Sequence, residues 1–373
     1  MQFELNAEQK ALQDSVARLL GRHYGFEQRR AIAAGAEGWS PDVWKELGNL
    51  GACSLLVPEA HEGFGGNAVD LLAVMPELGR TLSLEPFLAS SVLASTALTA
   101  APAGVRDALL PSASAGELLL AWAHDEPGAR HAPLWVETAA QRDGEGWRLS
   151  GHKCNVLHGA VAQRLVVTAR TKGEASGPEG LALFLVDTAA KGTQLTAHRL
   201  VDDSPAAEIL FDGVHADLLC TDAEAIAAVE RTQAMGIAAV CADALGAMEA
   251  AFALTTDYIR TRKQFGRTIG ENQALRHRVA EMFVSLEMCR SMAMVAAVAA
   301  SAESSADTRA DLARAKLMVG RHGRSLCHAA IQLHGGIGMT EEYAVGHYLR
   351  RVTLIDQLFG DADAQAARLA SMA

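Results

Sequence analysis

The chain has 373 residues and a formal net charge of −11; 50% of its residues are hydrophobic and 21% are charged. This composition predicts a fully folded globular protein, and the length predicts two or three cooperating units, because domains cluster near about 100 to 200 residues. The negative charge argues against a sequence-independent grip on nucleic acid, which depends on clustered Lys and Arg.

The N-terminus carries no targeting or membrane signal. It lacks a basic segment followed by an apolar one, and no stretch of about 18 uncharged apolar residues occurs in the chain. We therefore expect a soluble, cytoplasmic protein without a membrane span. The six cysteines show no CxxC spacing, so neither a metal site nor a disulfide framework is predicted.

Residues 1–118 are predicted to be helical. Asn6 is suited to cap a helix that runs from Ala7 to Tyr24. A second apolar register runs from Trp44 to Leu56, until Pro58 stops it. A glycine-rich turn at 61–66 is then followed by a helix from about 69 to 80.

The apolar period changes near residue 118, and residues 119–221 are predicted to form a β-domain. Short apolar runs alternate there with turn-rich segments. No helical pattern of a dozen residues separates the runs, so an antiparallel barrel or sandwich is favoured over a parallel doubly wound sheet. The runs lie at 118–123, 147–149, 165–169, 181–186 and 207–211.

The pattern is helical again over residues 222–373. The short connections between the segments favour an antiparallel bundle. We therefore predict an α+β fold with an N-terminal helical domain, a middle β-domain and a C-terminal helical bundle. The expected helices of the bundle are 222–260, 271–303, 306–333, 340–349 and 360–371.

Several short strings occur in an order and at spacings that point to one family. They are 47–59 with the glycine-rich 63–66, then 77–80, 126–129, 151–153, 262–266 and 332–338. On these strings the chain resembles the acyl-CoA dehydrogenase family over essentially its whole length. The strings 345–348 and 355–363 are most similar to the small subunit of pimeloyl-CoA-type dehydrogenases, which consist of two related but unequal chains.

The resemblance implies an enzyme that uses FAD to oxidise an acyl-CoA thioester between its α and β carbons. It further implies an electron-transferring flavoprotein as the electron acceptor, and a dicarboxylyl or bulky acyl-CoA as the substrate. The sequence leaves the acyl group itself open.

Arg262 and Phe265 are the first candidates for cofactor binding. Placed three apart at a helix end they would share one face, where a guanidinium can hold a pyrophosphate bidentately and a ring can pack beside it. In the family this segment reaches the FAD of the neighbouring subunit, and the residue matching Gln273 contacts the same cofactor. The alternative is that Arg262 is a surface charge and Phe265 a core residue that closes the helix.

The string 332–338 is the second candidate. Gly335 and Gly336 are typical of a helix C-cap, and they would equally let the adenine and ribose of FAD approach the backbone closely. By resemblance Gln332 belongs to the same contact. His334 is given a binding role and no catalytic one.

The side that would face the flavin ring departs from the family pattern. The resemblance places flavin contacts at the turn around Glu126 and on the strand after Lys153. Family members usually carry a Trp and a Thr on that strand, where this chain has Asn155 and Leu157. A complete flavin site within this one chain is therefore not expected.

The catalytic base is the second departure. Oxidation of the thioester requires a carboxylate to remove the α-proton. The two positions where the family carries its Glu are Gly360 and Gly236 in this chain. Asp361 and Asp356 lie near the first position, and Asp361 is equally suited to cap the last helix.

These departures favour a heteromeric enzyme in which this chain contributes part of the FAD site of a related, larger partner chain. Two alternatives stay open. One is a homotetramer that uses Asp361 or Asp356 as its base, and the other is a scaffold that binds neither flavin nor acyl-CoA. The retained strings 262–266 and 332–338 disfavour the scaffold.

Overall fold

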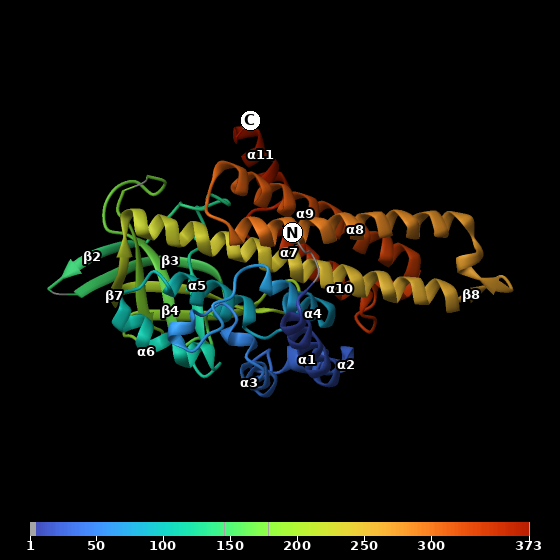
Figure 1. Ribbon diagram of the computed structural model, residues 1–373, viewed down its shortest axis with the longest axis horizontal. Helices are drawn as coiled ribbons and strands as arrows, with labels where there is room; N and C mark the ends of the chain where they lie inside the picture. Colours follow the sequence, from blue (N-terminus) through green and yellow to red (C-terminus); the bar gives the residue numbers. More distant parts are fainter. Residues whose placement is uncertain (1–4, 145, 178, 373) are drawn as a thin grey trace. The chain divides into compact units, whose positions relative to one another are not determined.

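A computed structural model describes residues 5–144, 146–177 and 179–372 (Figure 1). The chain folds into two compact units. The first comprises Met1–Arg30, Leu71–Ser83 and Ile237–Ala373, and the second comprises Ala31–Asp70 and Leu84–Gly236. The predicted order of a helical N-terminal domain, a middle β-domain and a C-terminal helical domain is confirmed.

The first helix begins where its capping residue predicts. Asn6 accepts a hydrogen bond from the backbone N–H of Gln9, whose side chain accepts one from the Asn6 N–H in return. This capping box starts α1. The helices of the N-terminal region are α1 (Ala7–His23), α2 (Phe26–Ala34), α3 (Pro41–Asn49), α4 (Met75–Thr81), α5 (Ser95–Leu98) and α6 (Ala103–Ser114), and a π-helix covers Phe87–Ala94.

Two predicted helices of this region are shorter than expected. The apolar register from Trp44 to Leu56 breaks at Gly51, whose φ of 76° ends α3 and leads into a 3₁₀ turn at Ala52–Ser54. The helix expected over 69–80 divides into a 3₁₀ turn at Asp70–Ala73 and α4. A matching apolar pattern therefore does not guarantee one continuous helix.

The middle domain is a small barrel. Its strands are β1 (Leu120–Ala123), β2 (Ala139–Asp143), β3 (Gly146–Leu157), β4 (Arg164–Arg170), β5 (Leu181–Asp187), β6 (Thr193–Arg199) and β7 (Pro205–Thr221). Pairing runs from β2 through β3, β7, β5 and β4, and returns to β2 through Ala139 and Arg170. Apolar residues that include Leu149, Phe184 and Val214 fill the interior and are buried.

Most of the ladders are antiparallel, as predicted, but β1 and β2 each pair in parallel with β4. A parallel pair requires a long connection, and the chain between β1 and β4 supplies one that contains the β2–β3 hairpin. The strands β2 and β6 have no matching apolar run in the sequence, because β6 is largely solvent-facing and β2 is rich in polar residues.

The C-terminal helices are α7 (Asp222–Thr261), α8 (Gln273–Ser301), α9 (Ala306–His334), α10 (Val345–Gln357) and α11 (Ala362–Met372). Helices α8, α10 and α11 all pack against α9. The helix expected over 340–349 begins later, at Val345, and ends later, at Gln357. A 3₁₀ turn covers Gly335–Met339. A short hairpin, β8 (Lys263–Gln264) and β9 (Arg267–Thr268), joins α7 to α8.

Two helices, α7 and α8, are long and apolar enough to cross a membrane by length and composition alone. In the most apolar 18-residue segment of α7, 72% is buried inside the fold, as in the core helix of a soluble protein. In the corresponding segment of α8 the buried share is 39%. The exposed apolar side chains on α8 are Phe283, Val284 and Met288, at 50%, 58% and 38% exposure. Helix α8 therefore presents an apolar face that the described residues leave uncovered.

Candidate cofactor site

Arg262 directly follows the end of α7 at the base of a hairpin, and Phe265 lies at the tip of that hairpin. Helix α7 stops at Thr261, and Phe265 and Gly266 have φ values of 53° and 81° in the turn between β8 and β9. Two successive positive φ values are typical of a tight two-residue hairpin turn. The prediction that Arg262 and Phe265 share a helix face is therefore wrong, because Gly266 lets the chain reverse at once.

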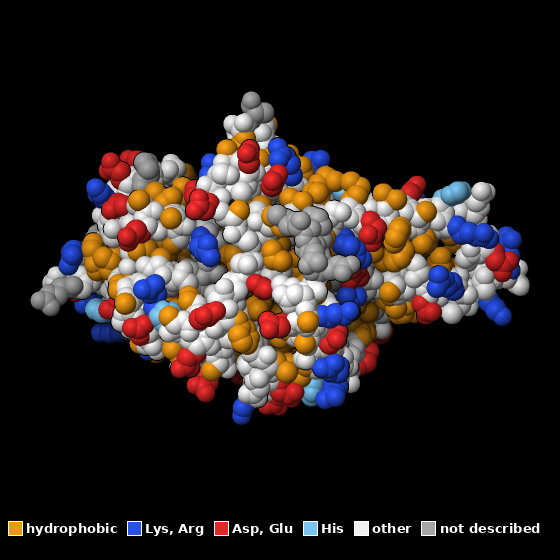
Figure 2. All heavy atoms as spheres, viewed as in Figure 1, with side chains coloured by type: hydrophobic (Ala, Val, Ile, Leu, Met, Phe, Trp, Pro, Cys, Tyr) orange, Lys and Arg blue, Asp and Glu red, His pale blue; other side chains and the backbone are white. Residues whose placement is uncertain are grey.

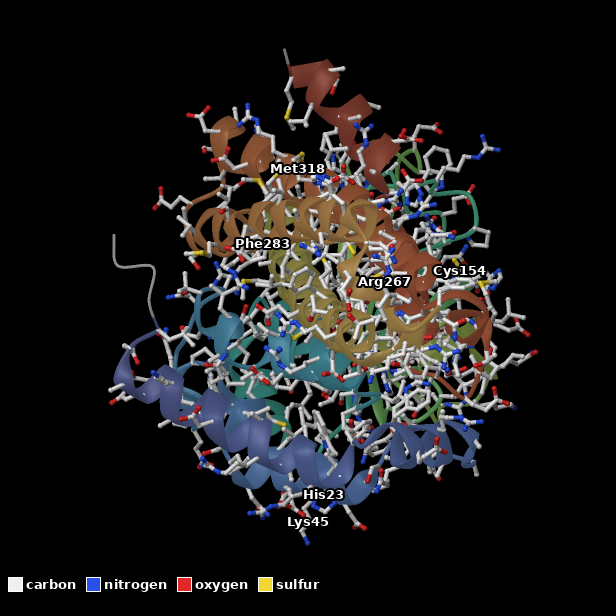
Figure 3. The ribbon with its side chains drawn as sticks, turned by 90° about the vertical axis from the view of Figure 1, so that its right-hand side faces the viewer. His23, Lys45, Cys154, Arg267, Phe283 and Met318 are labelled. Carbon is white, nitrogen blue, oxygen red and sulfur yellow. The ribbon has the colours of Figure 1, made fainter. Side chains whose placement is uncertain are left out.

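The hairpin presents its side chains to solvent. Phe265 is 99% exposed, so the alternative in which it closes the core is wrong as well. The Arg262 side chain is exposed and has no hydrogen bond or ion pair to any residue that the structure describes. Figure 2 shows Lys and Arg side chains near the hairpin between α7 and α8, and Figure 3 labels Arg267 of β9. A cation and an aromatic ring are thus available to another molecule.

Gln273 is the first residue of α8 and is exposed. A capping box at Thr268 and Glu271 shapes the turn that leads to it. Arg267 donates to the Asn272 side chain over 3.0 Å, which ties the hairpin to the start of α8. Only one 3₁₀ turn, Ile269–Glu271, and Asn272 separate Gln273 from the hairpin.

The string 332–338 ends α9 with an open stretch of backbone. Gly335 has a φ of 67°, which favours glycine, and a Cβ added at Gly335 or Gly336 would meet nothing within 4 Å. Both glycines and Gln332 are exposed. This turn can accept a flat group against its backbone, as the sequence predicts.

His334 lies under that turn in an aromatic cluster. Its ring centroid is 4.4 Å from that of Tyr258 and 5.0 Å from that of Tyr343. Nδ1 lies 2.8 Å from the carbonyl oxygen of Ala330, to which it donates, so Nε2 of the neutral ring is an acceptor. Burial lowers the pKa of His334, which favours that neutral ring. In the described part of the chain the buried Nε2 has no hydrogen-bond partner.

These contacts bring two of the predicted groups to the same end of the helical bundle. Tyr258 lies in the last turn of α7, four residues before Arg262, and it packs on His334 at the end of α9. An exposed guanidinium, an exposed ring, open glycine backbone and an orphaned acceptor fit the mixed polar and aromatic surface of a dinucleotide. Tyr258 and Tyr343 were missed from the sequence, although Tyr258 stands one helical turn before Arg262.

Glu126 belongs to the other unit and is committed to the barrel. Its carboxylate accepts from Lys153 Nζ at 2.6 Å and from the Thr138 hydroxyl at 2.7 Å. Desolvation raises the pKa of Glu126, but the ammonium and the hydrogen bonds outweigh it and hold the pKa below its ordinary value. Lys153 also donates to the His124 carbonyl and to Thr168, and its side chain is fully buried. Glu126 thus serves as an internal anchor here.

Asn155 stands at a β-bulge between β3 and β7, with a φ of 50°. Its N–H donates to Glu208, and its side-chain oxygen lies 3.3 Å from His198 Nε2. The residue is exposed and carries no ring, and Leu157 carries no hydroxyl. Positions 155 and 157 therefore lack the aromatic and hydroxyl groups that the resemblance leads us to expect.

The two acids near the C-terminus both have structural contacts. Asp361 accepts from the N–H of Ala364 at 2.8 Å, as the N-cap of α11. Asp356 is buried, accepts from Arg324 at 3.3 Å and from the N–H of Ala362 at 3.2 Å. These contacts show how each carboxylate is held within the first unit.

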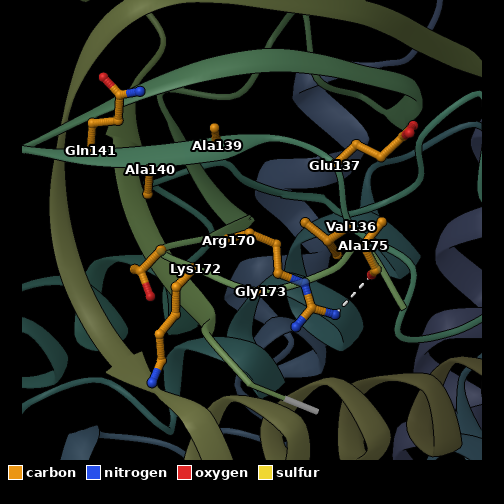
Figure 4. A pocket seen from close by; sticks show the side chains of 10 residues that line it. Val136, Glu137, Ala139, Ala140, Gln141, Arg170, Lys172, Gly173 and Ala175 are labelled. Atoms are coloured by element: carbon orange, nitrogen blue, oxygen red, sulfur yellow. Dashed lines mark hydrogen bonds between the residues drawn. The ribbon is translucent and has the colours of Figure 1, made fainter. Parts of the chain in front are cut away.

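A hollow of about 380 Å³ lies on the barrel (Figure 4). Arg170 lies in its wall and donates to the carbonyl oxygens of Leu134, Ala175 and Glu179, each over 2.8 Å. Among the described residues that line the hollow, none is a predicted site residue. We therefore assign the candidate site to the hairpin and the glycine turn.

Family models match the N-terminal helical region, the β-domain and the C-terminal helices of this chain. The models of the N-terminal, middle and C-terminal domains of acyl-CoA dehydrogenase match residues 6–117, 121–214 and 226–372. The chain belongs to the acyl-CoA dehydrogenase family. Its relatives in this family are oxidoreductases by name.

Among curated proteins, the probable acyl-CoA dehydrogenase YngJ of Bacillus subtilis is 27% identical and covers 99% of this chain and 98% of its own length. The acyl-CoA dehydrogenase FadE12 of Mycobacterium tuberculosis is 29% identical, with coverages of 92% and 90%.

Two solved structures of paired chains are also similar. A variant of the Tcur3481-Tcur3483 steroid ACAD is 29% identical with a TM-score of 0.87, covering 98% of this chain and 97% of that one. The ChsE4-ChsE5 complex from Mycobacterium tuberculosis is 25% identical with a TM-score of 0.88, and the coverages are 100% and 98%.

The buried ion pair of the middle domain makes a prediction for this chain. Lys153→Ala leaves the Glu126 carboxylate buried and uncompensated, so we expect a loss of about 3 to 5 kcal/mol in the free energy of unfolding. Lys172→Ala is the control, since Lys172 and Glu179 form an exposed pair at 3.7 Å that is worth at most about 1 kcal/mol. Denaturant titration measures both, and equal losses would contradict an anchoring role for the buried pair.

Asp361 offers a second prediction. Asp361→Asn should leave both stability and turnover nearly unchanged, because Asn caps a helix about as well as Asp, whereas Asp361→Ala should cost about 1 kcal/mol. Thermal melting and turnover of the assembled enzyme test this. A hundredfold fall in turnover of the Asn variant, with unchanged melting temperature and flavin content, would instead identify Asp361 as the base.

Proposed function

We propose that this chain is a subunit of an FAD-dependent acyl-CoA dehydrogenase and completes the flavin site of a related, larger partner chain. In that assembly the enzyme converts an acyl-CoA thioester to the 2-enoyl-CoA. By its C-terminal strings the chain corresponds to the small subunit of a pimeloyl-CoA-type enzyme.

The observation that carries this proposal is the hairpin tip. A phenylalanine that is 99% exposed gains nothing from the hydrophobic effect in the isolated chain. The neighbouring Arg262 is likewise directed to solvent. Both side chains can form stabilising contacts when a second molecule binds over them, as a partner chain with its flavin would.

The first unit supplies groups that suit the phosphate and adenine end of FAD. Arg262 would pair with the pyrophosphate, and Phe265 and Gln273 would pack beside it. Gln332, Gly335 and Gly336 would receive the adenine and ribose, with the free Nε2 of His334 as an acceptor below them. When bound, FAD supplies the acceptor for the hydride that leaves the β-carbon.

The base is expected on the partner chain. The family positions for the Glu are occupied by Gly360 and Gly236. Asp361 caps a helix and Asp356 is paired with Arg324. A carboxylate must lie within hydrogen-bond reach of the α-proton, and a partner that keeps the family Glu satisfies this condition.

The names of the two similar paired structures support a heteromeric assembly, and the uncovered apolar face of α8 offers surface for it. One of these proteins is named a steroid ACAD, so a bulky acyl group is a candidate beside the dicarboxylyl one that the pimeloyl-CoA-type resemblance implies. An electron-transferring flavoprotein would reoxidise the flavin. The second candidate is a homo-oligomer with Asp361 as its base, which the Asp361→Asn variant tests.

Expression with and without a partner tests the assembly. The chain alone should bind FAD weakly and show little dehydrogenase activity, because it lacks the aromatic, hydroxyl and carboxylate groups described above. Both properties should appear when a related larger dehydrogenase chain encoded beside it is co-expressed. Absorbance of bound flavin and acyl-CoA turnover are the measurements, and a stoichiometrically yellow, active single chain would overturn the proposal.

Arg262 provides a test of the cofactor contact. Arg262→Ala removes a charge-assisted bidentate contact worth about 1.5 to 3 kcal/mol, so FAD should bind about ten- to a hundredfold more weakly in the assembled complex. Lys should rescue only in part because it lacks the planar fork. Arg314→Ala on α9, which removes an exposed pair with Asp311, is the matched control. An unchanged FAD affinity in Arg262→Ala would show that the hairpin has no role in binding the cofactor.

A further inference from the structure

The turn between α10 and α11 has an unusual backbone. Phe359 and Gly360 have φ values of 60° and 92°, so two successive residues occupy the left-handed region. Only glycine enters this region without a steric penalty. This turn contains the position at which the family carries a catalytic Glu.

Two buried side chains hold the turn in this conformation. The ammonium of Lys316 donates to the carbonyl oxygens of Asp356 and Gly360, over 2.9 and 3.0 Å. The amide of Gln365 donates to the carbonyl oxygens of Phe359 and Gly360, over 2.8 and 3.3 Å. Lys316 and Gln365 are each fully buried, so no water competes for these acceptors.

The same contacts close the space around residue 360. A Cβ built on Gly360 would lie 2.9 Å from Nε2 of Gln365, closer than real Cβ atoms approach. The end of a free glutamine could swing aside. Here Nε2 is the atom that donates to the two carbonyls, so moving it breaks the bonds that define the turn.

The side chain of Asp356 adds a further contact at the start of this turn. Its Oδ1 accepts from the N–H of Ala362. A Cβ built on Gly320 of α9 would lie only 2.1 Å from this oxygen. Gly320 therefore lets the carboxylate pack directly against α9. The turn is fixed to α9 through Asp356 at its start and through Lys316 at Gly360.

We propose that Lys316 and Gln365 are positioning residues that reserve position 360 for glycine, so that this subunit is built without a base of its own. The lack of a carboxylate at position 360 then follows from the conformation and packing of the whole turn, and a single substitution does not restore it. Restoring Glu at position 360 should yield a strained turn and no working base. The consequence for catalysis rests on the proposed function, whereas the restriction of position 360 to glycine does not.

Alanine substitutions in the full-length chain test the structural claim. Gly144 has a φ of 61°, and a Cβ added there would meet nothing within 4 Å. Gly144→Ala therefore measures the loss of stability that a positive φ causes without a steric contact. Gly360→Ala adds the contact with Gln365 and should lower the melting temperature by at least about 3 °C more than Gly144→Ala does. Equal melting temperatures would overturn the proposal.

Amide exchange and turnover extend the test. Lys316→Met should speed exchange of the Ala362 and Ala364 amides at least about tenfold, because the turn that leads into α11 loses a support; the exposed Lys45→Met should change neither. Gly360→Glu in the assembled enzyme should show no gain in turnover, and a gain at the wild-type melting temperature would also overturn the proposal. An assembly inactive in every form would contradict the proposed function but leave the melting comparison valid.

Discussion

The hairpin between α7 and α8 imposes the main constraint on this protein, because the chain cannot bury the groups that the hairpin carries. Phe265 is 99% exposed, and Gly266 turns the backbone sharply enough to keep the ring at the tip. An aromatic ring and a guanidinium in such a position become stabilising only through contacts outside the chain. The proposed assembly and cofactor contact follow from this constraint, whereas the proposed place of the base follows from the glycines at positions 360 and 236.

Two buried lysines show how the fold accommodates charge in its interior. Lys153 pairs with the carboxylate of Glu126 inside the barrel unit. Lys316 instead donates to two backbone carbonyls in the helical unit. The first arrangement offsets one desolvated charge with another, and the second uses the ammonium to hold a turn. Removal of either lysine takes the charged donor away from a buried carboxylate or carbonyl, which costs more than the net value of the bonds.

Much of the fold could be predicted because periodicity and capping act locally. Asn6 and Gln9 form the expected box, and α8 and α9 begin and end within two residues of the predicted bounds. The strand β6 escaped prediction because it is largely solvent-facing and is held by its pairing with β7, so its sequence contains no apolar run. The helix expected from Trp44 onward was overextended, because Gly51 turns the chain without changing its apolar register.

The sequence by itself determined the family, the three-part order and the absence of a Glu at Gly360 and Gly236, because these are properties of residue identity and spacing. Only the tertiary structure decided how the candidate residues are placed. It placed Phe265 at a hairpin tip and Arg262 at the base of that hairpin, in place of one helix face, and it paired Glu126 with a buried lysine. It also placed the amide of Gln365 against Gly360. These outcomes depend on the direction of side chains and on neighbours distant in the sequence, which local pattern does not encode.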